Sequence, residues 1–301
     1  MKFATFRMDG RRMIGLVDAE AGTVRPLESI LGEPAADMVD LIRRYDDLKA
    51  RIGQGINQGA GQHGKAIDLS EVEIEAPIPR PARNVMCVGK NYFDHAHEFS
   101  RSGFDSSSRD KSDAIPEVPI IFTKVPESVI ADGQDILHPG GVSDSIDYEA
   151  ELTVVIGKGG RGITKEQAYG HIWGYTIIND VTARDVQGRH KQWFLGKSFD
   201  TFCPMGPWIV TADELDPASL AVRCWVNDEL RQDANTRDLI FDIPTLIETI
   251  SAGITLQPGD VIATGTPAGV GIGFNPPKYL NRGDRVTIEI EGIGRLVNTL
   301  R

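Results

Sequence analysis

Short apolar runs rich in β-branched residues recur along most of the chain, and Gly, Pro or Asp separates them. After residue 80 these runs read NVMCVG, PIIFTK, YEAELTVVIG, IWGYTIIND, LAVRCWVN, DVIATG, DRVTIEI and LVNTL. Runs of this length between turn-forming residues are typical of strands. Because few helical segments lie between them, the sequence predicts a mixed β fold with short helices, of the α+β class, and not a parallel βαβ array.

Apolar residues spaced by three and four positions predict the few helices. We expect these helices over residues 36–52, 91–99, 165–170 and 243–252.

The first 75 residues differ in pattern from the rest. KFATFRM and RMIGLVD alternate around Asp9-Gly10, which predicts a β-hairpin covered by the first helix. A Gly- and Gln-rich stretch and the proline-rich PIPRPARN follow. We therefore expect a small N-terminal α/β domain over residues 1–75 and a larger domain over residues 76–301.

The charge balance limits the partners of the protein. The 301 residues include 43 acidic and 32 basic side chains, which gives a net charge of −11, and no stripe of Lys and Arg is present. We therefore expect a small-molecule partner and neither nucleic acid nor an anionic membrane, since both of these require clustered cations.

The sequence also predicts a cytoplasmic protein. No apolar run approaches the roughly 18 residues that span a bilayer, and the N-terminal stretch lacks the apolar core of an export signal. Cys87, Cys203 and Cys224 lack CxxC spacing, so we expect them in the core and not in disulfides or metal sites.

Carboxylates cluster at the ends of two predicted strands. DYEAE enters one apolar strand, and Asn179-Asp180 ends another. Side chains alternate along a strand, so Glu149 and Glu151 project to one side, about 6 to 7 Å apart. Carboxylates this close favour a cation between them, and Asp180 would complete an all-oxygen site suited to Mg²⁺ or Mn²⁺. On spacing alone, a solvated strand face is the commoner arrangement.

A second candidate lies in NYFDHAHEF. His95 and Glu98 are three residues apart and share a face of the expected helix, so Glu98 could orient His95 as a general base. An exposed ion pair is the alternative. A Zn²⁺ site on His95 and His97 is disfavoured, because histidines two residues apart do not face one point on a helix.

Three further segments contain candidates. They are Lys197 in FLGKSFD, Gln187 in TARDVQ, and the turn Thr264-Gly265-Thr266-Pro267. A lysine beside a metal can stabilise an oxyanion, and a Gly/Thr turn can hold a carboxylate. Each feature alone is more often a surface lysine, a solvated glutamine or an ordinary turn.

Residues 100–118 form a polar insertion rich in Ser, Asp and Arg. Such a segment is either a lid or an exposed loop. In a lid, Arg101, Arg109 or Lys111 would close over a distal carboxylate of the substrate.

Seven ordered blocks between Ile78 and Leu300 together resemble the fumarylacetoacetate hydrolase superfamily. They are CVGKNYFDHAHE, PIIFTKVPES, DYEAELTVVIGK, GYTIINDVTARDVQ, WFLGKSFDTFCPMGP, VNDELRQ and GDVIATGTPAGVG. The resemblance implies the β-sheet roll of that family as the catalytic domain, and usually a homodimer. The TARD…RHKQ…GKS…PMGP run is most similar to longer bacterial members, which include oxaloacetate-active enzymes.

The resemblance also implies roles for individual residues. The Mg²⁺ or Mn²⁺ ligands of the family are matched by Glu149, Glu151 and Asp180. Its catalytic dyad and active-site lysine are matched by His95, Glu98 and Lys197. Contacts to the substrate are implied for Gln187, Thr266, Gly265 and Arg184.

For the substrate, the resemblance implies a 2-oxo acid that chelates the metal. It implies first a hydrolase that cleaves the C3–C4 bond of 2,4-dioxo acids, such as fumarylpyruvate or acetylpyruvate, to pyruvate and a carboxylic acid. Oxaloacetate decarboxylase or keto–enol tautomerase activity is the alternative, because these reactions share the same residues. A non-catalytic binding or regulatory protein is the alternative of another class, although it need not retain all of these residues.

Overall fold

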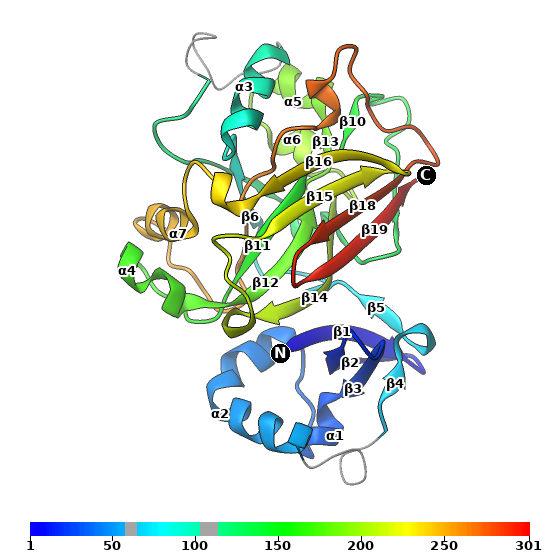
Figure 1. Ribbon diagram of the computed structural model, residues 1–301, viewed down its shortest axis with the longest axis vertical. Coiled ribbons are helices and arrows are strands. Elements are labelled where there is room, and N and C mark those ends of the chain that lie inside the picture. The colour runs from blue at the N-terminus through cyan, green and yellow to red at the C-terminus, as the bar shows by residue number, and fades with distance from the viewer. Residues whose placement is uncertain (58–64, 103–113) are drawn as a thin grey trace.

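The computed structural model describes residues 1–57, 65–102 and 114–301 (Figure 1). Its strands are β1 (Lys2–Met8), β2 (Arg11–Asp18), β3 (Thr23–Pro26), β4 (Ile67–Asp68), β5 (Glu73–Glu75), β6 (Val85–Gly89), β7 (Ile120–Lys124), β8 (Val129–Ile130), β9 (Asp135–Ile136), β10 (Ile146–Asp147), β11 (Ala150–Ile156), β12 (Ile172–Asn179), β13 (Thr182–Ala183), β14 (Cys203–Thr211), β15 (Ala221–Val226), β16 (Glu229–Asn235), β17 (Val261–Ala263), β18 (Arg285–Ile290) and β19 (Gly294–Leu300). Its α-helices are α1 (Leu27–Leu31), α2 (Met38–Asn57), α3 (Phe93–Ser102), α4 (Lys165–Ala168), α5 (Arg184–His190), α6 (Phe194–Lys197) and α7 (Ile243–Ser251). The expected α+β class is confirmed.

The largest sheet extends through the whole molecule. Its strand order is β4-β3-β2-β1-β14-β12-β11-β17-β6-β7, with β5 paired to β1 and β8 paired to β14. Strand β11 is antiparallel to both of its neighbours, β12 and β17. A second sheet, of order β16-β15-β18-β19-β9, lies over it (Figure 1). Leu152, Ile177, Val222 and Ile288 from the two sheets share one buried core, so the sheets pack face to face.

The N-terminal strands continue this large sheet. Strands β1 and β2 form the expected hairpin around Asp9-Gly10, and β1 also pairs with β14. Phe3 of β1, Tyr45 of α2 and Trp173 of β12 form an aromatic cluster with ring centroids 5.5 to 5.9 Å apart. Residues 1–57 therefore contact the rest of the chain through both backbone hydrogen bonds and a shared core.

The expected helices are present with shifted ends. Helix α2 continues past the expected end to Asn57, α3 begins at Phe93, and α4 ends at Ala168 before a 3₁₀ turn. Helices α5 and α6 were not expected, because RDVQGRH and FLGK are too short to show an apolar period. The three cysteines are buried and unpaired, as expected. Among the described residues, no helix is both long enough and apolar enough to cross a membrane.

Candidate metal and substrate site

The antiparallel pairing of β11 and β12 brings three carboxylates together. Glu149 directly precedes β11, Glu151 lies on it, and Asp180 directly follows β12. One carboxylate oxygen of each lies within 4.8 Å of the others. Their exposed fractions are only 4%, 1% and 0%, so the cluster is not a solvated strand face.

Buried cations balance two of these carboxylates. Lys197 Nζ lies 2.7 Å from Glu149 Oε2 and 2.8 Å from Asp180 Oδ2. Lys124 Nζ lies 2.6 Å from Asp180 Oδ1, and Arg184 Nη2 lies 2.6 Å from Glu149 Oε1. Against the opposing effect of burial, Lys197 and Arg184 lower the pKa of Glu149 to about 2. These ion pairs keep the Glu149 carboxylate charged inside the protein.

Glu151 has a different environment from the other two. Its Oε2 accepts a hydrogen bond of 2.8 Å from the Gly265 amide. Its Oε1 is buried and has no hydrogen-bond partner within residues 1–57, 65–102 and 114–301. Burial, together with the charges of Asp180 and Glu149, raises the pKa of Glu151 well above its ordinary value.

The donor set of these three residues fits a hard divalent cation. A buried carboxylate oxygen without a partner is costly, and a cation between three carboxylates would satisfy it. All the donors are oxygens, which suits Mg²⁺ or Mn²⁺. Glu149, Glu151 and Asp180 would therefore hold the metal.

Helix α3 brings the predicted histidine and glutamate together. His95 Nδ1 lies 3.4 Å from Glu98 Oε2, and His95 is 4% exposed. The ring of His95 stacks on Phe99 with the ring centroids 6.0 Å apart and an interplanar angle of 27°. His97 is exposed, whereas His95 is buried. The alternative of an exposed His/Glu pair does not hold.

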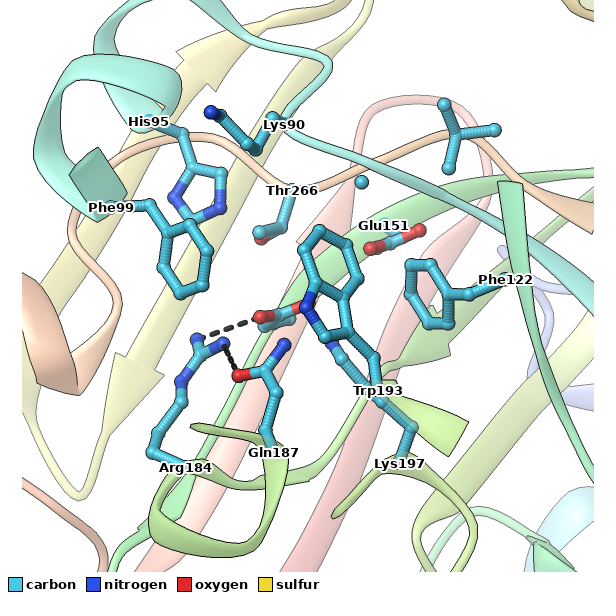
Figure 2. A pocket seen from close by; sticks show the side chains of 13 residues that line it. Lys90, His95, Phe99, Phe122, Glu151, Arg184, Gln187, Trp193, Lys197 and Thr266 are labelled. Carbon is cyan, nitrogen blue, oxygen red and sulfur yellow. Dashed lines mark hydrogen bonds and ion pairs between the residues drawn. The ribbon is translucent and has the colours of Figure 1, made fainter. Parts of the chain in front are cut away.

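A pocket joins these groups (Figure 2). It is lined by Val88, Gly89, Lys90, His95, Phe99, Phe122, Glu149, Glu151, Arg184, Gln187, Trp193, Lys197 and Thr266. Lys90 and His95 lie on one side of it, and Arg184, Gln187 and Lys197 lie on the opposite side (Figure 2). Most of the residues predicted from the sequence therefore face one space.

The remaining predicted residues lie around this pocket. Gly265 contacts Glu151 through its amide, and Glu98 contacts His95. Gln187 Oε1 accepts a hydrogen bond of 3.2 Å from Arg184 Nη1. Arg101 lies on α3 and is exposed, whereas Arg109 and Lys111 lie outside the described residues. The lid proposed over residues 100–118 therefore stays a prediction.

Sequence reasoning missed several residues of the site. Lys124 ends an otherwise apolar strand and is 0% exposed, a rare position for a lysine and therefore a usable signal. Asp147 accepts from Arg184 Nε at 2.8 Å and from the Gly271 amide at 2.6 Å, so it anchors the arginine of the pocket. Phe122 and Trp193 come from separate elements, and no local pattern marks them as neighbours of the site.

Comparisons with known proteins agree with this geometry. The family model for the C-terminal domain of fumarylacetoacetate (FAA) hydrolase matches residues 84–301. A Bacillus subtilis protein, oxaloacetate tautomerase YisK, is 45% identical over 310 residues, covering 100% of both chains.

Solved structures show the same relationship. A fumarylacetoacetate hydrolase from psychrophilic Exiguobacterium antarcticum is 39% identical, with a TM-score of 0.81 over 100% of this chain and 99% of that chain. A maleylpyruvate hydrolase from Sphingobium sp. SYK-6, in complex with manganese(II) and pyruvate, is 31% identical, with a TM-score of 0.79 over 100% of this chain and 98% of that chain. The chain therefore belongs to the fumarylacetoacetate hydrolase family.

Proposed function

We propose that this protein is a divalent-metal-dependent keto–enol tautomerase that acts on oxaloacetate. The observation that carries the proposal is the 45% identity, over the whole of both chains, to a relative named oxaloacetate tautomerase. The sequence alone places C–C hydrolysis first. The identity to this relative supports tautomerisation ahead of hydrolysis. The pocket residues do not decide between the two reactions, because both reactions would use them.

The metal supplies one part of the chemistry. When bound by Glu149, Glu151 and Asp180, Mg²⁺ or Mn²⁺ would polarise the 2-oxo carbonyl of the substrate and so acidify the neighbouring C3–H bond. Lys197 holds Glu149 and Asp180 in place through its two ion pairs, and it would add positive charge beside the carbonyl oxygen of the substrate.

His95 moves the proton at C3. A charged carboxylate only accepts hydrogen bonds, so Glu98 favours the tautomer of His95 that has its proton on Nδ1. The unprotonated Nε2 then serves as the base that removes a proton from C3 in one direction and returns it in the other. Phe99, Phe122 and Trp193 also line the pocket and would exclude water from the reacting carbon.

Lys90 provides a cation for the distal C4 carboxylate of oxaloacetate. It directly follows β6 with a φ of 55°, in the left-handed region that lysine rarely adopts. It is 3% exposed and lines the pocket on the same side as His95 (Figure 2). A dicarboxylate held between the metal ligands and Lys90 would place C3 beside His95.

Replacing Lys90 with Met should therefore raise KM for oxaloacetate by roughly tenfold or more, since a charge-assisted hydrogen bond contributes about 1.5–3 kcal/mol. Lys90→Arg is the matched control and should keep most of the affinity. The measurement is the rate of C3 hydrogen exchange in D₂O, with 2-oxobutyrate as a substrate that lacks the distal carboxylate. An equal loss with both substrates would contradict this role.

The proposed function is tested by following the enol form of oxaloacetate through its ultraviolet absorbance. The Mg²⁺-loaded protein should accelerate ketonisation, EDTA should remove the acceleration, and His95→Asn should reduce it by roughly a hundredfold or more. Release of carbon dioxide and pyruvate is measured in the same samples. Ketonisation at the uncatalysed rate would refute the tautomerase, and stoichiometric carbon dioxide would identify a decarboxylase.

Hydrolysis of 2,4-dioxo acids is the second candidate. It is favoured by the structural neighbour named maleylpyruvate hydrolase, which contains manganese(II) and pyruvate. In that reaction His95 would activate water to attack the C4 carbonyl instead of moving the C3 proton. Formation of pyruvate from acetylpyruvate or fumarylpyruvate would establish it. The homodimer implied by the family also stays a prediction, which sedimentation analysis can test.

A further inference from the structure

In the sequence, Tyr148 lies between Asp147 and Glu149. It is not among the residues that line the pocket. Its side chain is 0% exposed and packs in the core between the two sheets. Its hydroxyl oxygen nevertheless has two partners, the Gly269 carbonyl at 2.9 Å and Arg231 Nη1 at 3.3 Å. A guanidinium group only donates, so the Tyr148 oxygen accepts from Arg231 and its hydrogen is directed to the Gly269 carbonyl.

Gly269 connects this hydroxyl to the catalytic pair. Its amide donates to both carboxylate oxygens of Glu98, at 3.1 and 3.2 Å. Its φ is +97°, and a Cβ atom here would lie 1.9 Å from the Arg231 carbonyl oxygen, so only glycine fits. The residue is therefore fixed at its carbonyl by Tyr148 and presents its amide to Glu98.

The loop that follows completes the position of Glu98. Helix α3 contacts the 3₁₀ turn Gly271–Gly273. A Cβ atom at Gly273 would lie 1.8 Å from Glu98 Oε1, so the glutamate fills the space that this glycine leaves. Backbone groups from a different segment of the chain thus hold the residue that orients His95.

We propose that Tyr148 is a positioning residue for the His95–Glu98 pair and acts through Gly269. The hydroxyl holds the Gly269 carbonyl, the Gly269 amide holds Glu98, and Glu98 sets the tautomer and orientation of His95. The proposal rests on the acid–base role of His95 and Glu98 in the proposed function. It connects the segment that bears Glu149 and Glu151 to the helix that bears the base, so the metal ligands and the base keep a fixed relative position.

The first test is Tyr148→Phe, which keeps the ring in the core and removes only the hydroxyl. We expect kcat for oxaloacetate tautomerisation to fall roughly three- to tenfold, the effect of one hydrogen bond, with KM and Mn²⁺ affinity unchanged. Tyr175→Phe is the matched control, since Tyr175 is equally buried on the neighbouring strand β12 and does not contact α3 in any described hydrogen bond. A loss of Mn²⁺ affinity in Tyr148→Phe would show a general effect on the metal ligands and overturn the proposal.

A double-mutant cycle separates positioning from a structural effect. In the Glu98→Gln background, Tyr148→Phe should lower kcat clearly less than it does in the wild type, because a neutral amide no longer fixes the Nδ1 tautomer of His95 and the route through residue 98 is weakened. Multiplicative effects of the two changes would refute the proposal. If Glu98→Gln alone leaves kcat unchanged, the acid–base role in the proposed function fails; if Glu98→Gln lowers kcat and Tyr148→Phe does not, only the positioning role fails.

Gly273→Ala tests the same position without touching the tyrosine or a metal ligand. The added methyl group would displace Glu98, so we expect kcat to fall to the level of Glu98→Gln while Mn²⁺ affinity stays at the wild-type value. Gly253→Ala is the control, because a Cβ atom there meets nothing within 4 Å. Wild-type kcat in Gly273→Ala, with an unchanged melting temperature, would show that the placement of Glu98 does not matter and would overturn the proposal.

Discussion

Replacing Glu151 with Gln should abolish metal-dependent turnover and leave the metal-free protein at least as stable as the wild type. Glu151 makes no ion pair in the described residues, and a glutamine can still accept the hydrogen bond from the Gly265 amide. Its neutral amide would also relieve the cost of burial and the repulsion from Asp180 and Glu149, which together raise the pKa of the wild-type carboxyl. Loss of a metal ligand should reduce activity by at least a hundredfold, beyond the roughly 10–100-fold effect of altering an outer-shell partner.

Asp180→Asn is the informative comparison. It would also remove a ligand, but it would leave Lys124 and Lys197 buried beside a neutral group. Breaking a buried pair costs about 3–5 kcal/mol, so Asp180→Asn should be clearly destabilised where Glu151→Gln is not. Mn²⁺ titration and thermal melting in EDTA measure the two effects. Full Mn²⁺ affinity in Glu151→Gln would show that the cation binds elsewhere.

Replacing Lys124 with Met should destabilise the protein by about 3 kcal/mol, at the lower end of the range for a broken buried pair. Lys124 and Asp180 are both 0% exposed, and Lys124 Nζ also donates to the Val181 carbonyl at 3.0 Å. Asp180 would keep Lys197 as its second partner, which limits the loss. The measurement is urea unfolding of the metal-free protein.

The control is the same substitution in an exposed pair. Lys49 and Asp213 lie 2.7 Å apart, but each side chain is 48% exposed. Exposed pairs contribute about 0.2–1 kcal/mol, so Lys49→Met should change stability far less. Equal losses of stability on replacing the two lysines would mean that burial does not increase the contribution of the Lys124–Asp180 pair.

Local sequence patterns predicted much of the fold, and they identified the three carboxylates that form a candidate metal site. Short β-branched apolar runs predicted β11 and β12, and Glu149, Glu151 and Asp180 stood out as carboxylates at the ends of these runs. This worked because one antiparallel pairing brings all three residues together. Likewise, the three-residue spacing of His95 and Glu98 is sufficient to place them on one helical face.

The remaining parts of the site depend on contacts between distant segments. The lysine at position 124 reaches Asp180 across 56 residues, and the Gly269 amide reaches Glu98 across 171. No periodicity or short motif records such contacts, since they arise only when the strands and loops have packed. Local patterns also could not decide between the reactions, because the proposed hydrolysis and tautomerisation would use the same ligands and the same base.

The pairing of β1 with β14 has a consequence for shortened forms of this protein. Strand β14 lies between β12 and β1 in the sheet, and its first residues also pair with β8. Deleting residues 1–75 would expose part of that backbone and the aromatic face of Trp173 to solvent. Open strand edges recruit strands from other molecules, so such a fragment should aggregate unless a substitute cover is provided. The N-terminal segment thus covers an edge of β14 in the sheet that contains the candidate metal ligands.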